Sequence, residues 1–135
     1  MDTQLPIMLT LASRPCSIAN LESILSEAAR DYHVSEDTFG NMLVSLTEAV
    51  TNAIVHGNKR DISKSVQIQL RKSGGNFVIR VSDEGHGFDH ENLPDPTCVE
   101  NLLKLGGRGV FLIQQLSDTV RFYNNGSTVE MFFKL

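Results

Sequence analysis

The sequence lacks the features that mark several unusual classes of protein. Of its 135 residues only 2 are cysteines, Cys16 and Cys98, which lie too far apart for a paired metal-binding motif or a disulfide framework. No apolar run approaches the roughly 18 residues that span a bilayer, and residues 1–4 lack the basic region of a secretory signal. There are 12 Lys and Arg residues against 16 Asp and Glu residues, with no basic cluster, which argues against nucleic acid as a partner. We therefore expect a cytoplasmic protein with free thiols.

The composition is that of an ordinary globular domain, with 41% hydrophobic and 21% charged residues. A chain of this length can bury a sizeable core, so we expect a single domain over residues 1–135. Residues 5–11 alternate apolar and polar side chains, which predicts a half-buried strand, and Pro6 favours a position at the sheet edge. Apolar spacing of three and four residues then predicts a helix from about Ile18 to His33.

Alternating helical and strand periods organise the rest of the chain. Ser35 is the expected N-cap of a second helix that continues to Gly57. Two strands follow between Val66 and Val81, and residues 83–109 form a long connection rich in Gly, Pro and Asp, which is either functional or disordered. A short apolar helix over Val110–Leu116 and a hairpin turning at residues 124–126 come last. This order predicts helices on one face of a largely antiparallel sheet.

The second predicted helix carries two stripes. Its core stripe consists of Leu43, Leu46, Val50 and Ile54, and its polar line consists of Asn41, Ser45, Glu48, Asn52 and His56. Most such polar lines are solvated faces, but this one lacks Lys and Arg and places an asparagine in mid-helix. An alternative is a reactive pair in which Asn52 ligates Mg²⁺ and Glu48 accepts a proton. Spacing alone leaves both interpretations open.

Two glycine-containing segments follow the central strands. In Asp83-Glu84-Gly85-His86-Gly87-Phe88, the aspartate can accept a hydrogen bond from an exocyclic amine, and the glycines let the backbone approach a flat ligand. Gly106-Gly107-Arg108-Gly109 opens the last helix, where backbone N–H groups can cradle phosphate. Taken singly, the first segment is weak evidence because turns commonly contain such glycines, and the second is more often a loop-to-helix joint than a phosphate site. P-loop and dinucleotide-binding motifs are absent.

In this order and spacing, the three segments resemble the N, G1 and G2 boxes of the GHKL superfamily of ATPases and kinases. The run from Leu46 to Asn58 is similar to the N box of serine/threonine kinases that act as anti-sigma factors, and His56-Gly57-Asn58 distinguishes it from that of histidine kinases. The run from Phe88 to Ile113 resembles that family's ATP lid. The resemblance covers essentially the whole chain and implies an α+β fold, a two-layer α/β sandwich of the Bergerat type. Its sheet would be mixed and mostly antiparallel, with helices on one face.

The resemblance also implies a role for each matching position. Glu48 is expected to be the general base on the substrate hydroxyl, Asn52 the Mg²⁺ ligand and Asp83 the adenine anchor. The implied nucleotide-binding residues are Asn52, His56, Asp83, Gly85, Gly87, Gly107, Arg108, Gly109 and Thr128. One position departs from the pattern, because Leu105 stands where some members have an arginine that reaches the terminal phosphate. Lys104 or Arg108 could take its place.

The function implied is that of an ATP- and Mg²⁺-dependent protein serine/threonine kinase and anti-sigma factor in a bacterial partner-switching system. Its expected partners are a sigma factor and an anti-anti-sigma (STAS-type) protein, which it would phosphorylate on a hydroxyl through Glu48. No nucleic acid or membrane is expected to bind, and the resemblance is compatible with a homodimer. Two alternatives remain open: a regulatory module that sequesters a partner without phosphoryl transfer, and an ATPase whose Glu48 activates water.

Overall fold

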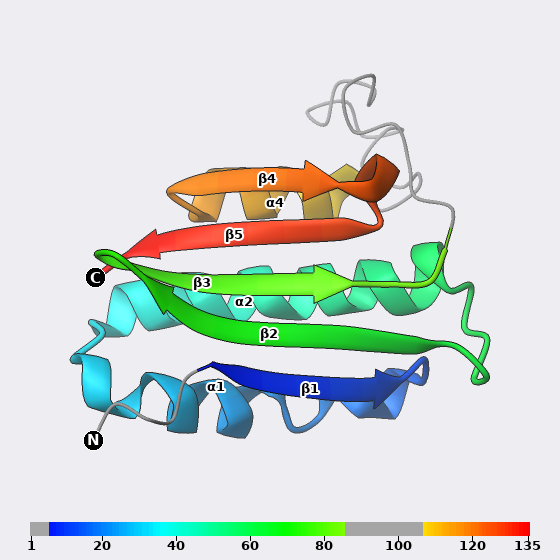
Figure 1. The fold of residues 1–135 in the computed structure, drawn as a ribbon, viewed down its shortest axis with the longest axis horizontal. Helices are drawn as coiled ribbons and strands as arrows, with labels where there is room; N and C mark the ends of the chain where they lie inside the picture. Colours follow the sequence, from blue (N-terminus) through cyan, green and yellow to red (C-terminus); the bar gives the residue numbers. More distant parts are fainter. Residues whose placement is uncertain (1–5, 86–106) are drawn as a thin grey trace.

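A five-stranded sheet forms one layer of the structure and helices form the other (Figure 1). The computed structural model describes residues 6–85 and 107–135. Along the sheet the strands follow the order β1-β2-β3-β5-β4. Their bounds are β1 (Ile7–Ala12), β2 (Ser65–Ser73), β3 (Asn76–Ser82), β4 (Thr119–Tyr123) and β5 (Thr128–Lys134). Each of the four pairings is antiparallel, so the described strands contain none of the parallel pairing that a mixed sheet would have.

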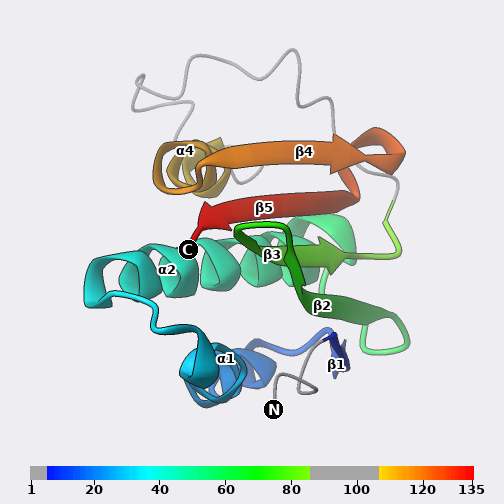
Figure 2. The ribbon, with the colours of Figure 1, turned by 60° about the vertical axis from the view of Figure 1, so that its left-hand side comes forward.

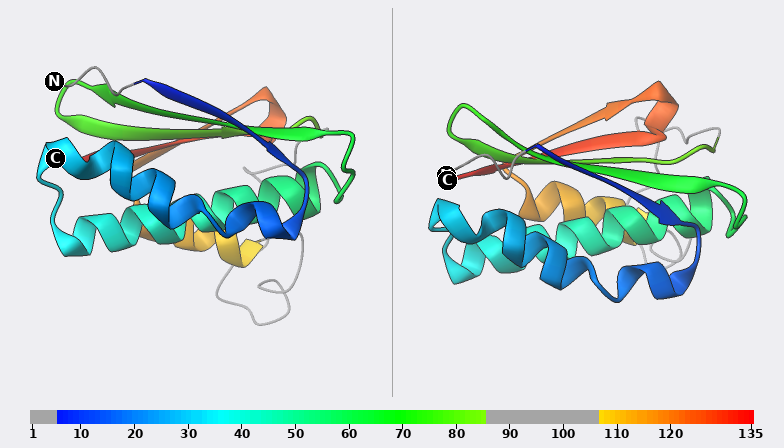
Figure 3. Two further views of the ribbon diagram at one scale, coloured as in Figure 1. Left: turned by 90° about the horizontal axis from the view of Figure 1, so that it is seen from below. Right: turned by 60° about the horizontal axis from the view of Figure 1, so that its bottom comes forward.

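The α-helices α1 (Leu21–Ala29), α2 (Glu36–Asn52) and α4 (Gly107–Leu116) all cover the same face of this sheet (Figure 3). The predicted fold class, a two-layer sandwich with helices on one face, is therefore confirmed. β1 lies at a sheet edge, as the proline beside it indicated. Within residues 6–85 and 107–135, none of the helices combines the length and apolarity needed to cross a membrane.

Helix α2 begins as its sequence predicts and ends differently. The side chain of Ser35 accepts a hydrogen bond from the backbone N–H of Thr38 at 3.1 Å, which is the expected N-cap. The α-helical geometry stops at Asn52, and the last turn, η3 (Ala53–Gly57), is π-helical. Single wide turns of this kind are frequent at functional sites. Here it determines where Gly57 and the residue that follows it are placed.

Two other helices differ from the predicted bounds. The first is shorter than expected, because the 3₁₀ turns η1 (Pro15–Ile18) and η2 (Arg30–Tyr32) replace its two ends. Helix α4 begins at Gly107 rather than at Val110, so the glycines form its first turn instead of preceding it. The final hairpin turns through η5 (Asn124–Gly126), where all three residues have positive φ, as an Asn-Gly turn allows.

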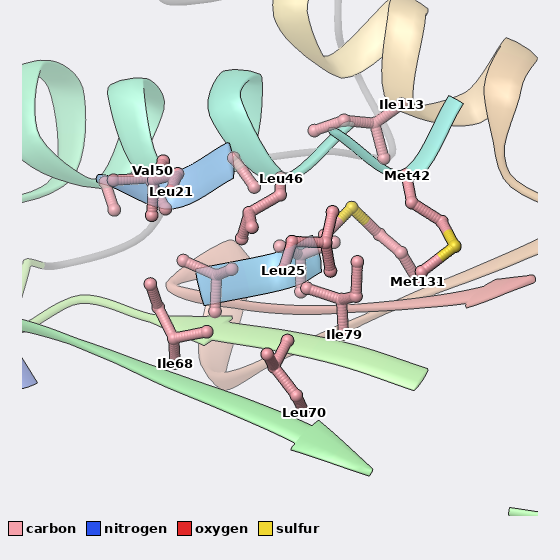
Figure 4. Packing of buried hydrophobic residues seen from close by; sticks show 14 of the residues in the cluster. Leu21, Leu25, Met42, Leu46, Val50, Ile68, Leu70, Ile79, Ile113 and Met131 are labelled. Atoms are coloured by element: carbon pink, nitrogen blue, oxygen red, sulfur yellow. The ribbon is translucent and has the colours of Figure 1, made fainter. Parts of the chain in front are cut away.

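The core lies between α2 and the sheet (Figure 4). Leu46, Val50 and Ile54 are completely buried there, as predicted. Leu43 is only half-buried at the edge of the core, and Met42 takes the buried position instead. The core stripe of α2 is therefore rotated slightly toward α4 and β5, whose Ile113 and Met131 complete this packing.

The opposite face of the sheet carries a charged cluster around Glu130. This residue is 4% exposed although no helix covers it. Its carboxylate accepts hydrogen bonds from Arg71 at 2.8 Å, from Arg80 at 3.3 Å and from the hydroxyl of Tyr123 at 3.1 Å. Because Arg80 also stacks on the ring of Tyr123, the long side chains of three strands shield one acidic group.

Candidate functional site

A pocket of about 290 Å³ opens between the C-terminal half of α2, the start of α4 and one end of the sheet. In Figure 2, α4 lies above α2, and the two helices pack against each other. Most of the wall is apolar, and a few polar groups interrupt it, as is usual in ligand sites. The lining residues are Ala49, Asn52, Ala53, His56, Gly57, Lys59, Val81, Asp83, Val110, Ile113, Phe122, Gly126, Ser127 and Val129.

Asp83 provides the carboxylate of the pocket, directly after β3. Its backbone N–H donates to the carbonyl of Ser127 at 2.9 Å, which anchors the end of β3 to the residue before β5. Its Oδ1 accepts a hydrogen bond from the N–H of Gly85 at 2.8 Å. Burial raises the pKa of Asp83, against the opposing effects of the Gly85 hydrogen bond and of Lys64. The ionised carboxylate is thus under-solvated and suited to accept a hydrogen bond from a ligand.

Two glycines allow the backbone to close around this carboxylate. A Cβ on Gly57 would overlap the carboxylate of Asp83, and a Cβ on Gly85 would overlap the carbonyl oxygen of Gly57. Both positions therefore require glycine for close approach rather than for a special φ angle. Sequence reasoning gave Gly85 a role in the site, but it treated Gly57 as the end of a helix and as part of the N box, without a role in the pocket.

Glu48 and Asn52 lie one turn apart on α2 and face the first turn of α4. A Cβ on Gly109 would lie 2.9 Å from Oε2 of Glu48 and 2.9 Å from Nδ2 of Asn52. Both side chains are half-buried, and Ser45 on the same polar line is completely buried. The solvated-face interpretation therefore does not hold for these three residues, and Glu48 and Asn52 pack against the first turn of α4.

The first turn of α4 places backbone N–H groups beside that pair. Gly107, Arg108 and Gly109 occupy this turn, where the N–H groups of a helix have no intrahelical acceptor. Such a turn attracts anions, and Gly109 lets it approach α2 closely. The side chain of Arg108 lies outside what the structure describes, as do Gly87 and the lid segment with Lys104 and Leu105.

Thr128 lies at the start of β5, outside the residues that line the pocket. In β5 it is paired with Ser82, and its hydroxyl donates to Oγ of Ser82 at 3.0 Å and accepts from Asn124 at 3.3 Å. The register places it on the sheet face away from the helices, since its neighbour Val129 lies on the pocket side. Thr128 therefore does not line the pocket itself, and its implied role in supporting the adenine site stays a prediction. Ser127, one residue earlier, lines the pocket instead.

Two side chains with nitrogen groups, His56 and Lys59, stand at the rim of the pocket. The pKa of His56 is lowered by partial burial and by the nearby charge of Arg60, so neutral imidazole is favoured. Sequence reasoning missed Lys59, which follows the π-helical turn in a left-handed conformation with φ of 53°. It also missed the apolar walls from β4 and β5, although the strand alternation at Phe122 and Val129 could have shown their common face.

Comparison with known proteins agrees with this geometry. A family model described as the histidine kinase-like ATPase domain matches residues 11–133. The chain therefore belongs to the histidine kinase-like ATPase domain family, which confirms the family predicted from the three boxes. As a member of an ATPase family it has an ATP-binding fold, and the pocket beside α2 is the candidate ATP site.

Within that family the chain is similar to serine-protein kinases named RsbW. The kinase of Listeria innocua is 29% identical over 136 residues, covering 93% of this chain and 84% of the relative. The kinase of Bacillus subtilis is 28% identical over 132 residues, with 93% and 82% covered. The kinase of Staphylococcus epidermidis is 32% identical over 119 residues, with 82% and 72% covered.

The fold itself is similar to a solved structure, that of the RsbU and RsbW domains of Rv1364c from Mycobacterium tuberculosis. The TM-score is 0.69 at 18% sequence identity, over 96% of this chain and 32% of that longer chain. This likeness supports the two-layer architecture independently of the sequence match.

Proposed function

We propose that the chain is an ATP-dependent protein serine/threonine kinase and anti-sigma factor of a bacterial partner-switching system, and that it phosphorylates an anti-anti-sigma (STAS-type) protein. One observation carries the proposal: Glu48 and Asn52 together abut Gly109 in the first turn of α4, beside the pocket that contains Asp83. A proton acceptor (Glu48) and a carboxamide (Asn52) thus lie beside an anion-binding helix turn. The pocket next to them contains Asp83, a carboxylate that can recognise adenine. The similarity to serine-protein kinases supports the choice of a hydroxyl as acceptor.

Adenine would lie at the Asp83 end of the pocket. The carboxylate accepts a hydrogen bond from the exocyclic amine, and it would repel the carbonyl that guanine presents at the same position. Apolar side chains of Val81, Ile113 and Val129 surround this end and suit a flat ring. His56 at the rim and the two glycines Gly85 and Gly87 complete the proposed base-binding residues.

The triphosphate would extend from there to the first turn of α4. Backbone N–H groups of Gly107, Arg108 and Gly109 would donate to phosphate oxygens, favoured by the helix dipole. Arg108 carries the only side-chain charge within this glycine turn and would contribute to holding the terminal phosphate in place of the arginine replaced by Leu105.

The residues present fit a Mg²⁺ ion held in part by the nucleotide. No group of three or more His, Cys, Asp or Glu side chains gathers among residues 6–85 and 107–135. Mg²⁺ commonly uses one or two protein oxygens together with substrate phosphates, and the carboxamide of Asn52 at the pocket wall can supply one. When bound, the ion would neutralise charge on the phosphates.

Glu48 would accept the proton of the attacking serine or threonine hydroxyl. The hydroxyl oxygen forms the new bond to the terminal phosphorus as the bond to the leaving phosphate oxygen breaks, and the proton passes to Glu48. Its half-buried position beside Gly109 supports a role for the carboxylate at the proposed phosphate end rather than at the adenine end. We place this reaction in the cytoplasm, with a sigma factor as the second partner.

Labelled ATP tests the proposal directly. The chain is incubated with [γ-³²P]ATP, Mg²⁺ and a purified STAS-type protein, and phosphate on the protein is separated from free phosphate. Label on a serine or threonine of the partner supports the kinase. Release of free phosphate alone would assign the site to an ATPase, and partner binding without any transfer would assign it to a sequestering module.

A further inference from the structure

Asn58 lies outside every role considered so far, yet it is among the most completely buried polar residues in the described chain. It follows the π-helical turn directly and is 1% exposed. Its carboxamide makes three hydrogen bonds: Oδ1 accepts from the N–H of Glu84 at 2.7 Å, and Nδ2 donates to Oγ of Ser13 and to the carbonyl of Ser65, each at 2.9 Å. These contacts join the loop after β3 to the ends of β1 and β2.

We propose that Asn58 is a positioning residue that fixes the Asp83–Gly85 loop and thereby sets the preference of the pocket for adenine. This inference rests on the proposed ATP site. Asp83 is held on both sides: its own N–H bonds to Ser127, and the next N–H along the chain, that of Glu84, bonds to Asn58. The carboxylate between these two anchors is left little freedom to shift relative to a bound base.

The partners of Asn58 are themselves fixed, so the anchor is rigid. The hydroxyl of Ser13 is completely buried and donates to the carbonyl of Lys64 at 2.7 Å. The carboxylate of Glu84 accepts hydrogen bonds from the N–H and hydroxyl of Ser65. Glu84 is thus tied to β2 through its side chain and to Asn58 through its backbone.

Backbone strain next to Asn58 indicates that this arrangement needs support. Lys59 and Arg60 both adopt left-handed conformations, with φ of 53° and 59°, which are unfavourable for residues other than glycine. Asn58 bonds to Ala53 through its N–H at 2.8 Å and to the N–H of Asp61 through its carbonyl at 3.0 Å. The same residue therefore holds both the strained segment that carries Lys59 to the rim and the loop that carries Asp83.

The chemistry of the position requires asparagine. Two donors and one acceptor are used at once, and only a carboxamide of this length supplies both. Aspartate would keep the acceptor for Glu84 and lose the donors, whereas alanine would lose all three bonds. This difference between the two substitutions provides a test.

The experiment compares wild type, Asn58→Ala, Asn58→Asp and the control Ser13→Ala, which removes one partner of Asn58 and keeps the bond to Glu84. Affinities for ATP and for GTP are measured by calorimetry, and thermal unfolding is measured without nucleotide. Amide exchange at Glu84 and Val81 is followed by NMR in each protein. The exchange measurement needs no nucleotide, so it remains decisive even if the chain fails to bind ATP and the proposed function fails.

We expect Asn58→Ala to lower ATP affinity about tenfold with little change for GTP, the size of effect that loss of one well-aligned hydrogen bond produces. In Asn58→Ala the backbone amide of Glu84 should exchange faster than in wild type, while that of Val81 stays protected. Asn58→Asp should retain most of the ATP preference, and Ser13→Ala should retain it fully, although both are less stable. A parallel loss of ATP and GTP affinity, or unchanged exchange at Glu84 in Asn58→Ala, would overturn the inference. Ser13→Ala provides a second test if Asn58→Ala does not fold. Ser13→Ala would overturn the inference if it lost the preference for ATP over GTP while its Glu84 amide exchanged no faster than in wild type.

Discussion

Gly57 and Asp83 are in direct contact, although 26 residues separate them in the sequence: the α-carbon of the glycine lies against the carboxylate, and a Cβ would overlap it. The π-helical turn that ends the helical segment of α2 brings them together. The motif at the end of the second helix and the motif after β3 therefore form one wall of the pocket rather than two separate features.

Gly57→Ala should displace the carboxylate and weaken nucleotide binding. Overpacking of this kind costs about 1–3 kcal/mol, which is roughly 5- to 150-fold in ATP affinity if the strain falls on the bound geometry. The matched control is Gly40→Ala in α2, where a Cβ meets no atom within 4 Å. That substitution should raise the free energy of unfolding by about 0.5–1 kcal/mol without changing affinity. Equal ATP affinity in Gly57→Ala and wild type would contradict the packing.

Asp83→Asn should weaken binding and stabilise the free protein. Losing a charge-assisted hydrogen bond costs about 1.5–3 kcal/mol, so ATP affinity should fall roughly 10- to 150-fold. The pKa of Asp83 is raised by burial, so the stability it contributes is complete below the ordinary aspartate pKa and is lost as the pH rises through the raised value. At pH 7 the free Asp83→Asn protein should therefore melt at a higher temperature than wild type.

The difference in melting temperature should shrink on acidification, because the carboxyl of the wild type then becomes protonated and resembles the neutral amide. Thermal unfolding between about pH 3 and pH 8 measures it. A wild type that is more stable than Asp83→Asn at pH 7 would show that the carboxylate is satisfied by its surroundings. Equal affinities of the wild type for ATP and GTP would remove Asp83 as the adenine anchor.

Glu48→Gln should separate binding from chemistry. The amide keeps the shape of the side chain but does not accept a proton, a step that contributes a factor of about 100 to 10,000 in rate. ATP affinity and capture of the protein partner should stay near wild-type values while transfer from labelled ATP nearly disappears. Transfer at the wild-type rate would exclude Glu48 from the mechanism.

Glu130→Gln should destabilise the sheet without touching the pocket. Burial alone would raise the pKa of Glu130, but the hydrogen bonds from Arg71 and Tyr123 and the two arginine charges outweigh it and lower the pKa. The stability that ionised Glu130 gives to the folded protein is therefore complete above the ordinary glutamate pKa. It is lost as the pH falls through the lowered pKa. We expect a loss of about 1–2 kcal/mol at pH 7, since both arginines are partly exposed.

The control for this prediction is Glu27→Gln, which changes an exposed carboxylate on α1 and should alter stability by less than about 0.5 kcal/mol. Denaturant unfolding at pH 7 and below the lowered pKa measures both variants. The difference in unfolding free energy between Glu130→Gln and wild type should disappear at the lower pH. A difference that stays constant with pH would assign the effect to packing.

Periodicity was sufficient to predict the sheet and the helices that cover it, because alternation and helical spacing depend only on which face is buried. The role of Thr128 came from the family resemblance instead, and the alternation along β5 puts its side chain on the face opposite to that of Val129. Periodicity could not show that Ser45 is completely buried on a polar line, because burial depends on packing between elements that are distant in sequence. The polar serine keeps no hydrogen-bond partner among the described residues.

The π-helical turn was likewise beyond sequence reasoning. Nothing in the run that ends in His56-Gly57-Asn58 indicates that one extra residue enters the last turn, yet that residue decides which side chain faces the core. The sequence therefore predicted the residue types of the site and their order along the chain. The roles of Gly57, Asn58 and Ser127 required the spatial arrangement.

The walls of the pocket include residues of α2, β3, α4, β4 and β5, so they span the chain from the middle of α2 to its last strand. No single helix or strand contains the whole binding surface, so nucleotide binding and global unfolding are thermodynamically linked. A nucleotide present at a hundredfold excess over its dissociation constant adds about 2.7 kcal/mol to the free energy of unfolding of the entire domain. Depletion of nucleotide would therefore shorten the lifetime of this protein against cellular proteases as well as leave its site empty.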